Sequence, residues 1–154
     1  MAANVVEMSG VANYTLADIA KFSKSKQFWV RAKINNDNRS INDSSSVKNV
    51  EHFMQILHLK LVSPRRDKAA FASYISRVES SIVDRFNSPQ GVFSEQIRLR
   101  QFGQNRRSVK FDADIIKDQD LDESYRFYQQ RFSNAANFNF IFVGNVDFYK
   151  WKRS

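Results

Sequence analysis

Two histidines and a glutamate lie within ten residues of one predicted helix, in the segment NVEHFMQILH at positions 49–58. A helical zinc motif needs two histidines four residues apart, as in H-E-x-x-H or the reversed H-x-x-E-H. For the reversed motif ending in Glu51-His52, position 48 would have to be histidine, and it is Lys48. His52 and His58 are about 120° apart round a helix and roughly 9 Å apart along it. The spacing therefore predicts a packing helix and no metal site.

An acidic cluster further along the chain has some of the spacing of a calcium loop. Starting at Asp118, the first three alternate acids fit such a loop, but its sixth position is Glu123 rather than glycine and its twelfth is Gln129 rather than glutamate. Acids in the first turn of a helix interact favourably with the helix dipole. We therefore interpret the cluster as a helix start. Its members are Asp112, Asp114, Asp118, Asp120, Asp122 and Glu123.

A basic segment with interleaved phenylalanines is the best candidate for binding nucleic acid. It contains Arg98, Arg100, Phe102, Arg106, Arg107, Lys110 and Phe111. Neither an aromatic RNP-type strand nor a G-x-x-G clamp accompanies it. The net charge of +8 comes from 24 basic residues mixed with 16 acidic ones, which is weak support for an acidic partner. A solvated basic face is the preferred interpretation, and a basic nucleic-acid-binding α+β module is the alternative.

Other common catalytic motifs are missing. The chain has no cysteine, which excludes disulfides, thiolate zinc sites and a cysteine nucleophile. No serine sits in a G-x-S-x-G motif, and no two of the four glycines are spaced for a phosphate loop. We therefore predict no catalytic, cofactor-binding or metal-binding residue in this chain.

The elements that position these residues predict one α+β domain over residues 1–154. The length suits one domain, and 42% apolar residues can build its core. Apolar periodicity predicts helices over 15–25 and 46–62, then helices beginning near Asp67, Ser88 and Asp120. Alternation predicts a strand at 28–34, a hairpin around 39–41 and a strong strand at 137–143. This order favours a mostly antiparallel sheet with helices on one face.

The same periodicity predicts which side chains are buried. The expected stripes are Val47, Val50, Phe53, Met54, Leu57 and Leu61 in the 46–62 helix; Phe71, Tyr74, Ile75, Val78, Ile82 and Phe86 in the next; Val92, Phe93 and Ile97 in the third; and Tyr125, Tyr128 and Phe132 in the last. No apolar run approaches the roughly 18 residues of a membrane span, and the opening segment lacks the features of a signal peptide.

Three blocks of the sequence, 5–22, 44–75 and 122–147, resemble the pitrilysin/insulinase family of zinc metallopeptidases. The resemblance rests on Pro64-Arg65-Arg66-Asp67 with Ala70-Phe71, and on the stretch from Tyr128 to Asp147 that contains FVGN. The likeness covers nearly the whole chain and is greatest to a domain from the non-catalytic half of the large bacterial members.

The resemblance implies a fold and a role. It implies a pitrilysin/insulinase-type domain, truncated at both ends and beginning inside an early strand, that helps to enclose peptide substrates in a chamber. The zinc and its H-x-x-E-H motif would belong to a catalytic domain of the parent peptidase, so this chain alone would be inactive and hold no cofactor. Its partners would be other domains of the same polypeptide and the peptide substrate. The bacterial relatives favour a periplasmic or cell-envelope location.

Overall fold

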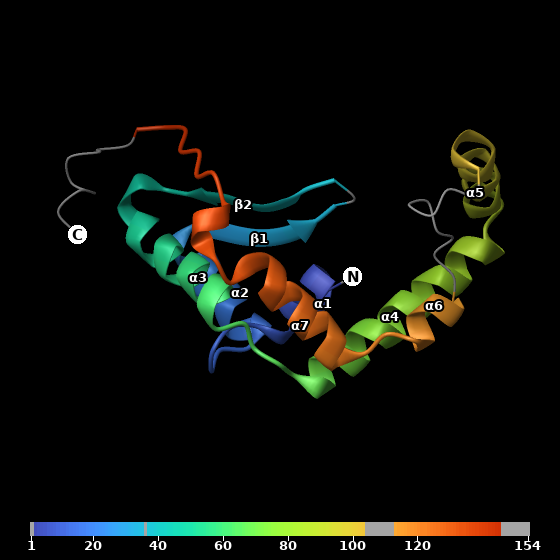
Figure 1. The fold of residues 1–154 in the computed structure, drawn as a ribbon, viewed down its shortest axis with the longest axis horizontal. Helices are drawn as coiled ribbons and strands as arrows, with labels where there is room; N and C mark the ends of the chain where they lie inside the picture. Colours follow the sequence, from blue (N-terminus) through green and yellow to red (C-terminus); the bar gives the residue numbers. More distant parts are fainter. Residues whose placement is uncertain (1, 36, 104–112, 146–154) are drawn as a thin grey trace.

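A β-hairpin with helices beside it forms the body of the molecule, and further helices extend away from it as an arm (Figure 1). The structure is a computed structural model that describes residues 2–35, 37–103 and 113–145. In chain order the elements are α1 (Ala2–Ser9), α2 (Leu16–Lys26), β1 (Phe28–Ile34), β2 (Arg39–Ser45), a 3-10 turn η1 (Val47–Asn49), α3 (Val50–Val62), α4 (Lys68–Asn87), α5 (Pro89–Phe102), α6 (Ala113–Lys117), α7 (Leu121–Phe132) and a 3-10 turn η2 (Ala135–Asn137).

The hairpin is antiparallel, as the alternation in the sequence predicted. Phe28 pairs with Ser45 and Ile34 with Arg39 at the two ends of the ladder. Side chains on one face of β1 are buried at Phe28, Val30 and Ala32, and those between them are exposed. α1, α2 and α3 all contact β1, and α7 packs against α1. The predicted α+β class, with helices on one face of an antiparallel sheet, is therefore confirmed.

The predicted helix starts are confirmed by their caps. Thr15 and Asp18 form a reciprocal capping box at α2. The Asp67 carboxylate accepts the N–H groups of Ala69 and Ala70 at 3.0 Å, and Asp120 accepts the N–H of Glu123 at 2.8 Å. Each cap satisfies backbone donors that the first turn of a helix leaves without a partner.

Two clusters of buried side chains form the core of the body. One lies where α1, α3, β1 and α7 meet and contains Ala3, Val6, Ala32, Leu61, Tyr128 and Phe132. The other lies between β1 and α3 and contains Phe28, Val30, Phe53, Ile56 and Leu57, with Ile19 and Phe22 of α2 packed against it. The two clusters together cover one face of β1 from end to end, which fixes the helices on the hairpin.

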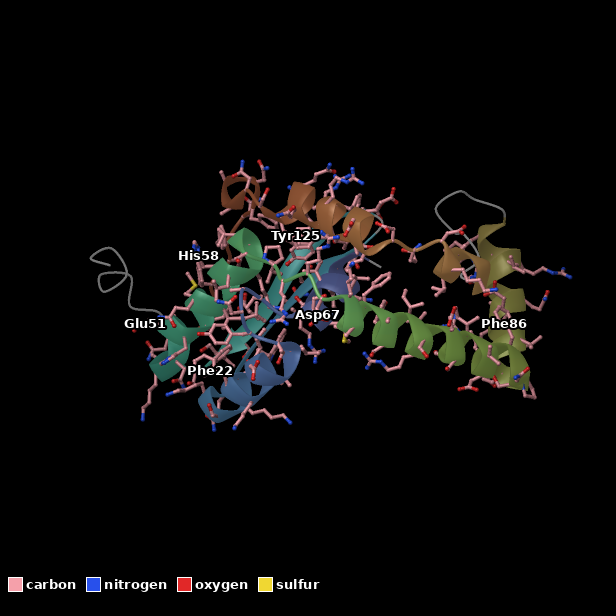
Figure 2. All side chains as sticks on the ribbon, turned by 90° about the horizontal axis from the view of Figure 1, so that it is seen from below. Phe22, Glu51, His58, Asp67, Phe86 and Tyr125 are labelled. Atoms are coloured by element: carbon pink, nitrogen blue, oxygen red, sulfur yellow. The ribbon has the colours of Figure 1, made fainter. Side chains whose placement is uncertain are left out.

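The arm is α4 followed by α5, joined at a sharp elbow. Figure 2 shows α4 running from Asp67 beside the body to Phe86 at its far end. Ser88 caps α5, and Pro89 occupies its first turn. A Cβ atom at Gly91 would lie 2.0 Å from the Arg85 carbonyl oxygen, so the two helices meet too closely there for any other residue. The predicted third helix is confirmed, but the elbow directs it away from the body.

The expectations for residues 2–9, for the α5 stripe and for Val47 are wrong. Residues 2–9 form helix α1 rather than part of a strand, because Ala3, Val5, Val6 and Ser9 pack at helical spacing. Val92, Phe93 and Ile97 are 43%, 60% and 40% exposed rather than buried, since within the described chain α5 makes its main contacts with α4 only. Val47 is 63% exposed, because the chain enters α3 through a 3-10 turn that rotates this residue off the α3 stripe.

The predicted strand at 137–143 also differs in the structure. Asn137 ends η2, and residues 138–143 belong to no strand. A strand forms only when its N–H and C=O groups make hydrogen bonds with a neighbouring strand. No segment among the described residues pairs with residues 138–143. Phe138 still packs on Phe132, with ring centroids 5.7 Å apart. None of the helices in the part of the chain that the structure describes is long and apolar enough to cross a membrane.

Candidate functional site

The two histidines of helix α3 lie in different surroundings. The His52 ring packs edge-on against Phe22 with centroids 5.5 Å apart, and its Nδ1 is buried with no hydrogen-bond partner among the described residues. Glu51 and His58 lie at separate points along α3 and are exposed (Figure 2). Within the described ranges no three His, Asp or Glu side chains gather closely enough to hold an ion. The positions of Glu51, His52 and His58 do not suit shared coordination of a zinc ion.

A buried ion pair lies at the junction of the main helices, and sequence reasoning missed it. Lys60 Nζ is 2.5 Å from Glu7 Oε1, and the exposed fractions of the two side chains are 6% and 18%. The same Glu7 oxygen accepts the backbone N–H of Ala32 at 3.1 Å. The sequence contained one sign of this pair: Lys60 is a charged residue one turn from Leu57 on the apolar face of α3, where a charge needs a partner.

Tyr128 completes this cluster. Its hydroxyl donates to the Lys60 carbonyl oxygen at 3.2 Å, and the neighbouring Tyr125 hydroxyl donates to the Pro64 carbonyl oxygen at 2.9 Å. Burial, together with the nearby Glu7 charge, raises the pKa of Tyr128, so its hydroxyl stays protonated. The cluster joins α1, α3, β1 and α7. The polar groups of Glu7, Lys60 and Tyr128 are hydrogen-bonded within the core, so we interpret the cluster as structural rather than reactive.

The acidic cluster acts at a helix start, as interpreted from the sequence. Asp120 caps α7, and Asp122 and Glu123 lie in its first turn. Asp122 also forms an ion pair with Arg66, which precedes α4. The side chains of Asp112 and Asp114 are outside the described residues. Asp120, Asp122 and Glu123 therefore act at the start of α7, and Asp122 also links it to the segment before α4.

The basic segment is only partly described. Arg98 forms two hydrogen bonds of 2.7 and 2.9 Å to the Glu95 carboxylate, which raise the pKa of Arg98. Arg100 and Phe102 are exposed on α5. Arg106, Arg107, Lys110 and Phe111 lie outside the described residues. Nucleic-acid binding by this segment therefore stays a prediction.

Two apolar surfaces of the described chain are left uncovered. On α5 the exposed side chains are Val92, Phe93, Ile97, Leu99 and Phe102. The second surface belongs to the apolar segment of residues 138–143, beyond Phe138, which packs on Phe132. Its Phe140, Ile141, Phe142 and Val143 are 50%, 84%, 37% and 93% exposed. The rings of Phe140 and Phe142 stack with centroids 6.5 Å apart, as alternate residues on one side of an extended chain do. Residues 133–145 carry no charged side chain.

Comparison with solved structures shows proteases with this fold. The periplasmic protease PqqL from Escherichia coli superimposes with a TM-score of 0.77 and 19% identity, over 99% of this chain and 17% of PqqL. The ferredoxin protease FusC, in complex with Arabidopsis ferredoxin, superimposes with a TM-score of 0.69 and 13% identity, over 86% of this chain and 15% of FusC. No protein-family model and no curated protein matches the sequence. The chain has the fold of about one sixth of each protease, which confirms the fold implied by the pitrilysin/insulinase resemblance.

Proposed function

We propose that this chain is a non-catalytic domain of a zinc-dependent metallopeptidase of the pitrilysin/insulinase type. In this proposal it forms part of the wall of a substrate-enclosing chamber, and the parent polypeptide hydrolyses peptides. The observation that carries the proposal is the match to PqqL across 99% of the chain at a TM-score of 0.77. Two proteases share the fold, and the sequence motifs around Pro64 and Phe142 point to the same family.

The uncovered apolar surfaces support a role inside a larger protein. In the segment 138–143, Ile141 and Val143 are more than 80% exposed. Exposure of apolar side chains to water is unfavourable, so such a surface is often covered by another part of a protein. A neighbouring strand would pair the backbone of residues 138–143, and a neighbouring helix or sheet would cover α5. The partners we propose are other domains of the same polypeptide, since this chain spans only 17% of the length of PqqL.

The catalytic chemistry would come from another domain. The histidine ligands and the general base of the family belong to an H-x-x-E-H motif, and this chain has Lys48, in the 3-10 turn before α3, where the first histidine would stand. The part played by this chain would be to exclude folded proteins by the size of the chamber and to contact the enclosed peptide. A periplasmic location is proposed with it, because PqqL is a periplasmic protease.

The proposal is tested on the complete reading frame. We expect an H-x-x-E-H motif upstream of the segment that corresponds to this chain. In the intact polypeptide, Ile141→Asp should abolish most peptide hydrolysis while the zinc content is unchanged, because a carboxylate cannot enter a sheet interior without a partner. Lys48→Ala is the matched control, since Lys48 is exposed.

Two outcomes would contradict the proposal. One is a complete reading frame with no zinc motif and no peptidase activity. The other is full activity of the Ile141→Asp polypeptide, which would mean that residues 138–143 are not covered by the rest of the protein.

A further inference from the structure

A groove begins between α1 and α4, extends along α4 as far as Arg85, and combines a basic rim with an apolar floor. Its volume is about 480 Å³, and its lining, as far as the structure describes the chain, contains two arginines and no acidic residue. Met8, Val78 and Ile82 form the apolar part, and Ile82 is only 3% exposed. The polar lining residues are Asn4, Tyr74, Arg77, Ser81 and Arg85.

Neither arginine of this groove has a carboxylate partner in the described part of the chain. Arg77 donates from Nε to the Ser73 carbonyl oxygen at 3.3 Å and from Nη2 to the Met8 sulfur at 3.4 Å, which are neutral acceptors. The described ion pairs elsewhere involve Lys60, Arg65, Arg66 and Arg98, and Arg85 is in none of them. Two guanidinium groups therefore face the same groove with their charges unpaired by any described acid.

The spacing of the arginines indicates the shape of a ligand. Arg77, Ser81 and Arg85 follow one another at four-residue intervals, so they share a face of α4, and the rise between the two arginines is about 12 Å. In an extended peptide, side chains four residues apart point to the same side and lie about 13 Å apart. Two carboxylates at that spacing would reach both arginines and place the side chain midway between them over the apolar floor.

Tyr74 adds a donor beside the arginines. Its hydroxyl oxygen accepts a hydrogen bond from Asn4 Nδ2 at 3.4 Å, which leaves the hydroxyl proton available to a ligand. Guanidinium groups bind carboxylates through two parallel N–H groups, so the rim suits acidic side chains. Tyr74 is the one aromatic residue in the described lining, and a single ring gives no platform on which successive bases could stack. The lining therefore favours a peptide over a single-stranded nucleic acid.

We propose that the groove between α1 and α4 binds an extended acidic peptide, with carboxylates on Arg77 and Arg85 and an apolar side chain between them on Met8, Val78 and Ile82. The site belongs to this chain by itself. It stands whether or not the chain is part of a peptidase, so its test is separate from that of the proposed function.

The test is fluorescence anisotropy of labelled peptides with the purified 154-residue chain. The probe is a short peptide that carries Glu-Ala-Val-Ala-Glu and has no other charged group, and its control has Gln in place of both Glu. We expect saturable binding of the acidic probe alone. Arg77→Gln and Arg85→Gln should each weaken binding about tenfold or more, as loss of a hydrogen bond to a charged group does. Arg126→Gln, which removes an exposed charge from α7, should leave binding unchanged.

Each alternative outcome overturns the proposal. No binding of the acidic probe, equal binding of the Gln control, or equal loss with Arg126→Gln would do so. Tighter binding of a single-stranded oligonucleotide than of the probe would show that the groove binds nucleic acid rather than peptide. Circular dichroism spectra of the three variants should match the parent spectrum, because all three arginines are exposed.

Discussion

At the residue scale, the buried Lys60–Glu7 pair is the main feature that only the structure reveals. The residues are 53 positions apart, and nothing in their local sequence links them. The zinc question was different, because helix geometry alone excluded a shared ion for His52 and His58 before any coordinates. Local spacing can therefore reject a site from sequence, whereas a contact between α1 and α3 depends on how the helices pack on the hairpin.

Removing one partner of this pair should destabilise the fold strongly. Glu7→Ala leaves the Lys60 ammonium buried without its partner, so we expect the free energy of unfolding to fall by about 3 kcal/mol. The double variant Glu7→Leu with Lys60→Met should recover most of that loss, because it removes both charges. Urea denaturation measures the three values, and a double variant less stable than Glu7→Ala would contradict the argument.

The stabilisation by the Asp67 cap should depend on pH. The N–H groups of Ala70 and Ala69 and the Arg65 side chain lower the Asp67 pKa from 3.8. A carboxyl whose folded pKa is depressed stabilises the fold above its unfolded pKa and loses that contribution as pH falls through the folded value. Asp67→Ala should therefore cost about 1 kcal/mol at pH 7 and less at pH 2. Urea denaturation at both pH values checks this, and an unchanged difference would refute it.

At the element scale, the helices and the hairpin followed from local signals. Capping residues and four-residue periodicity act within one helix, so Thr15, Asp67, Ser88 and Asp120 could be recognised as starts. Burial on α5 could not be derived in this way, because it depends on where the elbow at Gly91 directs the helix. The segment 138–143 has the alternation of a strand, but pairing depends on a partner that the described chain does not provide.

Removing an apolar side chain should lower the free energy of unfolding much less in the arm than in the body. Phe93 is 60% exposed on α5, so Phe93→Ala should change the free energy of unfolding of this chain by no more than about 0.5 kcal/mol. Phe132 is fully buried, and its ring stacks on Tyr128 with centroids 4.5 Å apart. Phe132→Ala should cost about 3–5 kcal/mol. Urea denaturation compares the two, and a large loss with Phe93→Ala would show that α5 is covered within this chain.

At the scale of the whole molecule, a packed body carries an arm and the segment 138–143, both of which expose large apolar side chains in the described chain. This combination suits a domain whose surfaces are completed by neighbours, and it agrees with the likeness to about one sixth of each of two proteases. The fold class could be predicted from sequence because the capping and alternation signals agreed with one another. The proposed place in a chamber goes further, and it depends on the rest of the polypeptide.

The most direct measurement of the central claim is zinc content together with peptide hydrolysis, for this chain alone and for the complete polypeptide. The account predicts about one zinc and peptide cleavage for the complete polypeptide, and neither for the chain of 154 residues. Stoichiometric zinc in the chain alone, lost in His52→Ala and accompanied by cleavage, would contradict the account.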